Sequence, residues 1–186
     1  MFILYPMLLT IPYHTFDVSN VHLTPFQFNK YGKSIARLTY KDNSIDFHDI
    51  SILTPPLTVY DYYPNTMKMR LDLSDQPQFQ IKMNTLYEYL INTFYIHQHN
   101  FLHQQHHTID SIRNIFYSMI EHTLLSLYIN PSTTVNRNNT KPEKISDIAM
   151  GDTVRCIIRI QGISQVLGKD GFHLRVHHSI PAVYKF

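Results

Sequence analysis

The residues with the most obvious chemical potential form a histidine-rich tract, HQHNFLHQQHH, which covers residues 97–107 and holds five histidines. His99 and His103 are four residues apart, a spacing that places two imidazoles on one helical face and is used in zinc sites. The tract has no Glu between them to act as a base and no nearby acid to orient an imidazole. We therefore expect no metal here and interpret the tract as a polar helix extension or loop; a metal-dependent enzyme is the minor alternative.

Covalent chemistry finds little support in the sequence. The chain lacks a G-x-S-x-G elbow, a Gly-rich phosphate loop and a dinucleotide fingerprint. Its one cysteine, Cys156, falls on the apolar face of a predicted strand, which is typical of a small core residue. Asp46 and Asp49 flank His48, but an exposed polar strand explains them without a metal site. We expect no catalytic residues and no cofactor, so the protein is predicted not to be an enzyme.

Basic and aromatic side chains are interleaved along several predicted strands. Single-stranded nucleic acid is bound by this combination, because cations follow the phosphates while flat rings stack on unpaired bases, at about 1–3 kcal/mol per base. The candidate binding residues are Arg37, Tyr62, Tyr63, Lys68, Arg70, Arg155, Arg159, Arg175 and His177. The same pattern includes Lys30, Tyr31, Tyr40 and Tyr60, although most aromatic residues are expected in the core.

Composition limits the class of protein. The 186 residues carry a formal charge of +2, which excludes a strongly polybasic tail. The charge is uneven, however: residues 1–136 sum to −2 and residues 137–186 to +4, which favours a basic binding face that the total conceals. A single cysteine excludes an intramolecular disulfide and a Cys-rich zinc module, and it favours a reducing, intracellular compartment.

The apolar start of the chain, residues 1–10, is interpreted as a strand or packing arm. It lacks a basic n-region, Pro6 interrupts it, and no small-residue cleavage site follows, so it is not typical of a secretory signal. No uncharged apolar run of 18 residues occurs, so we expect no membrane association.

Hydrophobic periodicity predicts a mainly β chain with a few helices. Strands are predicted over residues 34–40, 44–53, 57–63, 66–73, 123–129, 154–161 and 172–180. Helices are predicted over residues 79–94, 108–121 (N-capped by Thr108 or Asp110) and 145–150. In the strand over 154–161, the even-numbered residues are expected to face inward, and Arg155, Ile157, Arg159 and Gln161 outward. Gly162 is expected at a bulge, Asp170 and Gly171 in a hairpin turn, and Pro181 at the end of the last strand.

These elements predict one domain over residues 1–186. It consists of an N-terminal arm with strands (1–53), barrel strands and helices (57–129), a polar loop (136–143) and a C-terminal β-hairpin (152–184).

The C-terminal run GDTVRCIIRIQGISQVLGKDGFHLRVHHSIPAVY resembles the closing hairpin of single-stranded DNA-binding proteins from large double-stranded DNA viruses. The shared pattern is a Gly turn, a strand V-x-C-I-I-x-I, then x-G-I, a variable hairpin and a final strand with alternating basic residues. Upstream, TMKMRLDL, the helix around TLYEYL, and LSLYI before NPSTTV follow the order of that family. The layout covers residues 55–184, and the motif about 34 residues.

This resemblance implies an α+β, mainly β fold: an OB-like antiparallel barrel elaborated by two or three helices, with Arg155, Arg159 and Arg175 on the binding face. The final strand of the family often carries a Trp, which this chain lacks, and the histidine tract has no counterpart there. The expected function is sequence-independent single-stranded DNA binding in viral or plasmid DNA replication, recombination or repair, in the host nucleus or at a viral replication site. Expected partners are single-stranded DNA, with RNA left open, replication proteins and a second copy of the chain. The alternative is a structural or interaction protein, such as a virion component or replication scaffold, with a tyrosine-rich surface.

Overall fold

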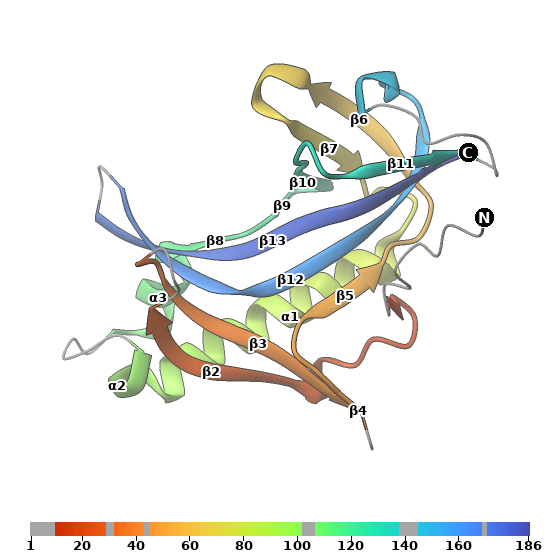
Figure 1. Ribbon diagram of the computed structural model, residues 1–186. Helices are drawn as coiled ribbons and strands as arrows, with labels where there is room; N and C mark the ends of the chain where they lie inside the picture. The colour runs from red at the N-terminus through yellow and green to blue at the C-terminus, as the bar shows by residue number, and fades with distance from the viewer. Residues whose placement is uncertain (1–9, 29–31, 43–44, 102–106, 138–144, 169–170) are drawn as a thin grey trace.

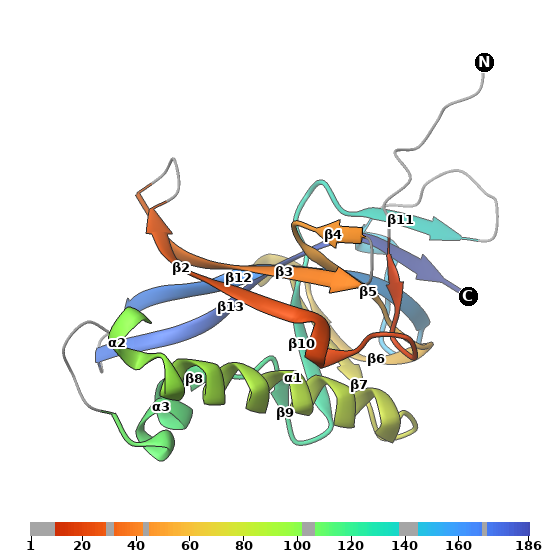
Figure 2. The ribbon, with the colours of Figure 1, turned by 90° about the horizontal axis from the view of Figure 1, so that it is seen from below.

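The computed structural model describes residues 10–28, 32–42, 45–101, 107–137, 145–168 and 171–186. Strands dominate these ranges and pair into one curved sheet, with the helices packed on one side of it (Figures 1 and 2). The expected fold class, α+β and mainly β, is confirmed.

The strands are β1 (Ile11–Pro12), β2 (Val21–Phe28), β3 (Ser34–Asp42), β4 (Ile45–Phe47), β5 (Ile50–Leu53), β6 (Leu57–Tyr63), β7 (Lys68–Asp72), β8 (Phe116–Tyr117), β9 (Ile120–Glu121), β10 (Leu124–Tyr128), β11 (Thr134–Arg137), β12 (Thr153–Gly168) and β13 (Gly171–Lys185). The helices are α1 (Pro77–Ile96), α2 (Gln98–Phe101) and α3 (Ile109–Ile115), and short 3-10 turns lie at Val18–Asn20, Pro64–Thr66 and Ile145–Asp147.

The long strand β12 organises the sheet (Figure 1). One of its edges pairs with β13, and the other edge pairs in turn with β6, β5 and β3. Its register with β13 shifts twice, between Ile157 and Arg159 and between Ile160 and Gly162. The second shift confirms the bulge expected at Gly162, where an added Cβ would lie 2.2 Å from the carbonyl oxygen of Ala36. Any side chain at this position would therefore push β12 away from β3.

The sheet curls but does not close. Beyond β6 it continues through β7 and β10 to β9, while the far edge of β13 pairs with β8 and β11. No ladder joins β10 to β13 within the described ranges, so the sheet does not close into the barrel that was expected. The two strands lie near each other, and the backbone N–H of Tyr128 donates to Nε2 of His178 at 3.4 Å. The pairs β1–β5, β8–β13 and β11–β13 are parallel, which corrects the expectation of an antiparallel sheet throughout.

The hydrophobic core lies between the sheet and α1 (Figure 2). Pro77 begins this helix, where its missing N–H leaves no hydrogen bond unmade. The apolar stripe predicted for the helix is buried: Phe79, Met83, Leu86, Tyr87, Leu90, Ile91 and Phe94. The hydroxyl of Tyr87 accepts the N–H of Met119 at 2.6 Å, so the polar end of this buried ring is satisfied. No described helix is long and apolar enough to cross a membrane.

The second predicted helix, residues 108–121, is too long. Thr108 caps α3 as expected, since its hydroxyl accepts the N–H of Ser111 at 3.1 Å, but the helix ends at Ile115. Phe116 and Tyr117 instead form β8 against β13. The ladder with β13 and the packing of Phe116 on the ring of Tyr87 outweigh the weak helical preference of two aromatic residues. The helix predicted over residues 145–150 is likewise only a 3-10 turn.

The strand predicted over residues 44–53 is two strands. β4 pairs with β3 and β5 pairs with β12, so the chain changes partners at His48 and Asp49. This break matters for the site, because it places the carboxylate of Asp49 beside β12.

Two strand ends also differ from the prediction. β7 begins at Lys68 because the preceding turn ends in Met67, whose φ of 51° is left-handed. β13 continues through Pro181 to Lys185. Pro181 lies where the register with β12 shifts, between Ser179 and Ala182, so its missing N–H does not interrupt the ladder.

Some expectations fall outside the described residues. They are the arm before Thr10, Lys30 and Tyr31, His103 and His106 of the histidine tract, most of the polar loop over 136–143, and the hairpin tip at Lys169 and Asp170.

Candidate nucleic-acid interface

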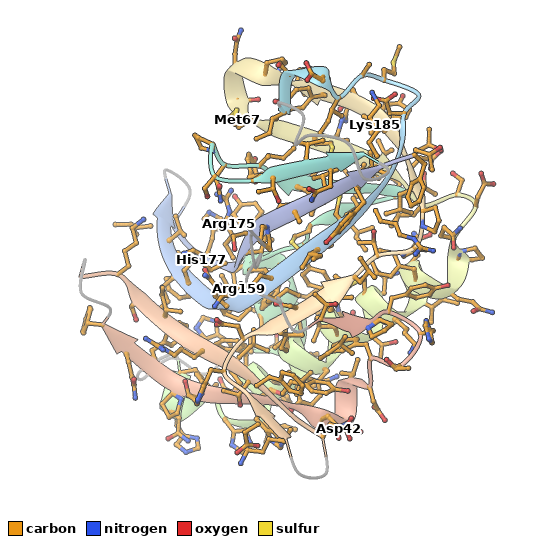
Figure 3. All side chains as sticks on the ribbon, turned by 45° about the vertical axis from the view of Figure 1, so that its right-hand side comes forward. Asp42, Met67, Arg159, Arg175, His177 and Lys185 are labelled. Atoms are coloured by element: carbon orange, nitrogen blue, oxygen red, sulfur yellow. The ribbon has the colours of Figure 1, made fainter. Side chains whose placement is uncertain are left out.

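The helices cover one face of the central sheet (Figure 2), and the opposite face carries basic side chains (Figure 3). Along β3, β12 and β13, alternate residues are buried in the core, as are Ala36, Ile163 and Val176, so their neighbours point to the other face. We call this second face the central basic face. Its basic residues are Arg37, Arg159, Arg175 and His177.

Strand register brings these residues together. Gly162 pairs with Arg37 on one side and with His177 on the other, so the two side chains flank a position that has none. Arg175 lies two residues before His177 and therefore on the same face of β13. Arg175, His177 and Arg159 gather in the middle of the view in Figure 3.

Arg37 and Arg175 are exposed cations. Among the residues that the structure describes, no carboxylate forms an ion pair with either guanidinium. The guanidinium of Arg175 lies 5.5 Å from the ring centre of Tyr117, which is 47% exposed. That ring lies 4.7 Å from the ring of His173. The face thus combines unneutralised guanidinium groups with an accessible aromatic ring.

Burial and nearby positive charges both lower the pKa of His177 on this face and that of its neighbour in the strand, His178. Burial lowers the pKa of His177, and the charge of Lys33 lowers it further. Burial also lowers the pKa of His178, with smaller contributions in the same direction from His177 and Arg175. Bound anions would reverse the electrostatic part of both effects.

Arg159 shares this face but is already paired with an acid. Its Nε donates to Oδ2 of Asp49 at 3.0 Å, and its Nη2 contacts the same oxygen. The side chains of Arg159 and Asp49 are 41% and 27% exposed, so the ion pair is open to water.

Arg155, the second arginine predicted on this strand, is less accessible. It is half-buried, pairs across the ladder with Tyr184 and lies 5.8 Å from the ring centre of Phe186. Ile157, which was expected to face outward between the two arginines, is only 4% exposed. Arg155 and Arg159 therefore do not form one continuous exposed strip, although alternation places them on the same face.

Other predicted residues form a second group on β6 and β7, which we call the Tyr60–Arg70 cluster: Tyr60, Asp61, Tyr63, Lys68 and Arg70. Asp61 is opposite Arg70 in the ladder, and Tyr63 is opposite Lys68. The guanidinium of Arg70 lies 5.3 Å from the ring centre of Tyr60 and 5.8 Å from that of Tyr63. Its Nε donates to both oxygens of Asp61 at 2.8 Å.

The charge of Arg70 is matched within this cluster by Asp61. Hydrogen bonds from Arg70 and, to a lesser extent, from Tyr63 lower the pKa of Asp61, whose hydrogen bond in turn raises the pKa of Arg70. A surface pocket of about 570 Å³ beside the cluster is lined by Tyr60, Asp61, Arg70 and the exposed Met150, among others. The cluster therefore offers accessible rings, but its arginine is already neutralised.

Two tyrosines of the predicted basic-aromatic pattern lie on the core side. Tyr62 is opposite Met69 and packs against the core, and burial raises its pKa. Tyr40 is 2% exposed, and its hydroxyl accepts the backbone N–H of Asp17 at 3.2 Å.

Sequence reasoning missed Tyr117, His173 and the role of Asp49. Tyr117 was hidden inside the helix predicted over residues 108–121, although the dipeptide Phe116–Tyr117 fits a strand better than a helix. His173 alternates with Arg175 and His177 and was expected to face outward with them, but it was not counted among the candidate binding residues. No local signal identifies Asp49 as a partner of Arg159, because the two are 110 residues apart.

Metal and thiol chemistry gain no support from the geometry. Within the described ranges, no group of three His, Cys, Asp or Glu side chains is arranged to hold a metal ion. Cys156 is buried, as its place in the strand predicts, and this burial raises the pKa of its thiol to about 12. A thiol held in that state is a poor nucleophile near neutral pH.

The chain matches no family model, no curated protein and no solved structure.

Proposed function

We propose that the protein binds single-stranded nucleic acid without sequence readout, with single-stranded DNA as the first ligand, and that the central basic face holds the strand. The observation that carries this proposal is that Arg37 and Arg175, which form no ion pair with a described carboxylate, lie on the same face as the exposed ring of Tyr117. Guanidinium groups bind phosphates, and an accessible ring stacks on an unpaired base. The charge of Lys33 supports the same proposal: it adds to the effect of burial in lowering the pKa of His177, and a positive charge beside this face attracts anions.

The layout of the sheet supports a finer proposal, that the fold is an OB-like barrel elaborated by helices and left open between β10 and β13. The sheet curls from β12 through β6 and β7 to β10. A hydrogen bond from the backbone of Tyr128 in β10 to the side chain of His178 links β10 to β13, the partner of β12. The resemblance of the C-terminal run supports a role in viral or plasmid DNA replication, recombination or repair, with replication proteins as further partners.

The test is a fluorescence-anisotropy titration of labelled oligo-dT, repeated between about 50 and 200 mM salt, with a duplex of equal length as competitor. Each phosphate contact should contribute a slope of about −0.7 in a log–log plot. Arg175→Gln should weaken binding and flatten the slope by about one contact. Arg113→Gln is the matched control, since Arg113 is exposed on α3 and pairs with Glu88. Affinity that is independent of salt, or equal binding of the duplex, would contradict the proposal.

A second candidate function, protein–protein interaction, is favoured by the Tyr60–Arg70 cluster. Tyr60 is 50% exposed, Tyr63 46% and the neighbouring Met150 77%. Exposed Tyr, Met and Arg are enriched in protein interfaces, and a neutralised arginine is easier to desolvate than a free one. Tyr60→Ala/Tyr63→Ala separates the two functions: it should leave oligo-dT binding unchanged if the central basic face holds the strand.

A further inference from the structure

The central basic face contains one arginine whose guanidinium already holds an anion, the carboxylate of Asp49. Arg159 is opposite Ser51 in the ladder between β12 and β5. Asp49 precedes Ser51 by two residues, so alternation places it on the same face as Arg159. The two side chains are in contact on this face, where Nε and Nη2 of Arg159 both donate to Oδ2 of Asp49.

We propose that Asp49 is an intramolecular substitute for a phosphate group, which occupies Arg159 in the free protein and is displaced when a single strand binds. This inference rests on the proposed function and adds a control on the affinity of that same site. Carboxylate and phosphate are the two anions that the guanidinium fork binds best, so one can replace the other at the same donors.

Solvent exposure makes the exchange feasible. With side chains 41% and 27% exposed, the Arg159–Asp49 pair is partly hydrated, and ion pairs of this kind contribute little to stability. A strand already attached to Arg37 and Arg175 presents its next phosphates at a high local concentration, because those contacts lie on the same face. The displaced carboxylate then remains beside the strand and repels it.

The Arg70–Asp61 pair has a different environment. Its side chains are 27% and 17% exposed, and Tyr63 donates a further hydrogen bond to Oδ2 of Asp61 at 3.0 Å. Asp49 has no such second donor among the described hydrogen bonds, so its carboxylate is the easier of the two to displace.

The inference predicts that Asp49→Asn strengthens binding. Freeing one arginine adds one phosphate contact, which steepens the salt slope by about 0.7 and raises the oligo-dT affinity roughly eightfold at about 50 mM salt. Asp110→Asn is the matched control, because it makes the same change in net charge on α3, where Arg113 keeps its second partner, Glu88. Asp49→Ser serves as a second variant, and thermal melting checks that both variants fold.

A double-mutant cycle assigns the gain to Arg159. The gain from Asp49→Asn should be clearly smaller in an Arg159→Gln background, since no guanidinium is then left to free and only the repulsion between Asp49 and the strand is removed. If the wild-type protein binds oligo-dT but Asp49→Asn behaves like Asp110→Asn, the inference is wrong and the proposed function stands. If the wild-type protein does not bind oligo-dT at low salt, the proposed function itself fails.

Discussion

The central basic face and the Tyr60–Arg70 cluster have similar sequences and different electrostatics. Both place arginines and tyrosines on outward positions of strands, and an alternation pattern cannot distinguish them. On the central face, Arg37 and Arg175 have no described carboxylate partner, whereas Arg70 lies between two rings with Asp61 on its guanidinium. A basic residue on a strand is therefore available to a phosphate only if the fold places no acid beside it. The residues on the neighbouring strands determine whether an acid is there.

The largest expected effect comes from removing two cations from each region. Arg37→Gln/Arg175→Gln should lower oligo-dT affinity roughly sixtyfold at about 50 mM salt, from two phosphate contacts with a slope of about −0.7 each. Lys68→Gln/Arg70→Gln removes the same charge from the Tyr60–Arg70 cluster and should change affinity by less than about threefold, since general attraction alone is lost. Anisotropy titrations of both variants decide the matter. Equal losses would mean that the strand contacts both regions.

A smaller effect is expected from the aromatic rings. Tyr117→Leu keeps most of the apolar volume but removes the flat ring, and it should weaken binding about tenfold, within the range for one stacked base. The matched change Tyr63→Leu should have no such effect. Quenching of tyrosine fluorescence by oligo-dT provides the measurement, because the quenching should diminish only in the Tyr117 variant.

The pH dependence of binding should distinguish the regions more finely. In the free protein, burial and the charge of Lys33 lower the pKa of His177, so the imidazole is neutral at pH 7. A phosphate nearby raises this pKa, so the protein takes up a proton on binding. Affinity should therefore be about threefold higher near pH 6, below the ordinary histidine pKa of about 6.5, than near pH 7.5. This gain is lost as the pH rises through the pKa of His177 in the bound form.

His177→Gln is the control for that measurement and should remove most of the rise. The charged or titratable groups that act on His177 and His178 include Lys33 and Arg175. Because the charge of Lys33 lowers the pKa of His177, Lys33→Gln should shift the pH profile of binding to higher pH. An unchanged profile in His177→Gln would place the titrating group elsewhere.

The smallest effect is expected from the histidine tract. Replacing all five histidines of residues 97–107 by Gln or Ser should leave folding and binding at pH 7.5 unchanged, with any loss confined to lower pH, where imidazoles gain charge. Circular dichroism and the same titration test this. Stoichiometric zinc retained through dialysis against a chelator, together with loss of folding in the variant, would instead favour a metal site.

Elements with a strong period could be predicted from the sequence. The stripe from Phe79 to Phe94 and the alternation around Cys156 correspond to α1 and the start of β12, because one-sided burial imposes a regular period. Where tertiary pairing decided the outcome, the prediction was wrong. The partner change at Asp49, the conversion of Phe116 and Tyr117 to a strand, and the passage of β13 through Pro181 each depend on a distant strand.

The candidate site divides in the same way. Outward positions such as Arg37, Arg175 and His177 follow from alternation alone. The neutralisation of Arg159 and Arg70 does not, since it depends on which acid the fold places beside each guanidinium. Burial of Ile157 on an outward position likewise has no local signal.

The central place of β12 has a consequence for protein synthesis. β3, β5 and β6 all pair with a strand that begins at Thr153, so the ribosome makes them long before their partner exists. Until β12 emerges, the edges of these strands are unpaired and able to associate with other chains. The many long-range pairings also favour slow folding. In the nascent chain, the edges of the N-terminal strands therefore stay unpaired until the segment that completes the sheet has been synthesised.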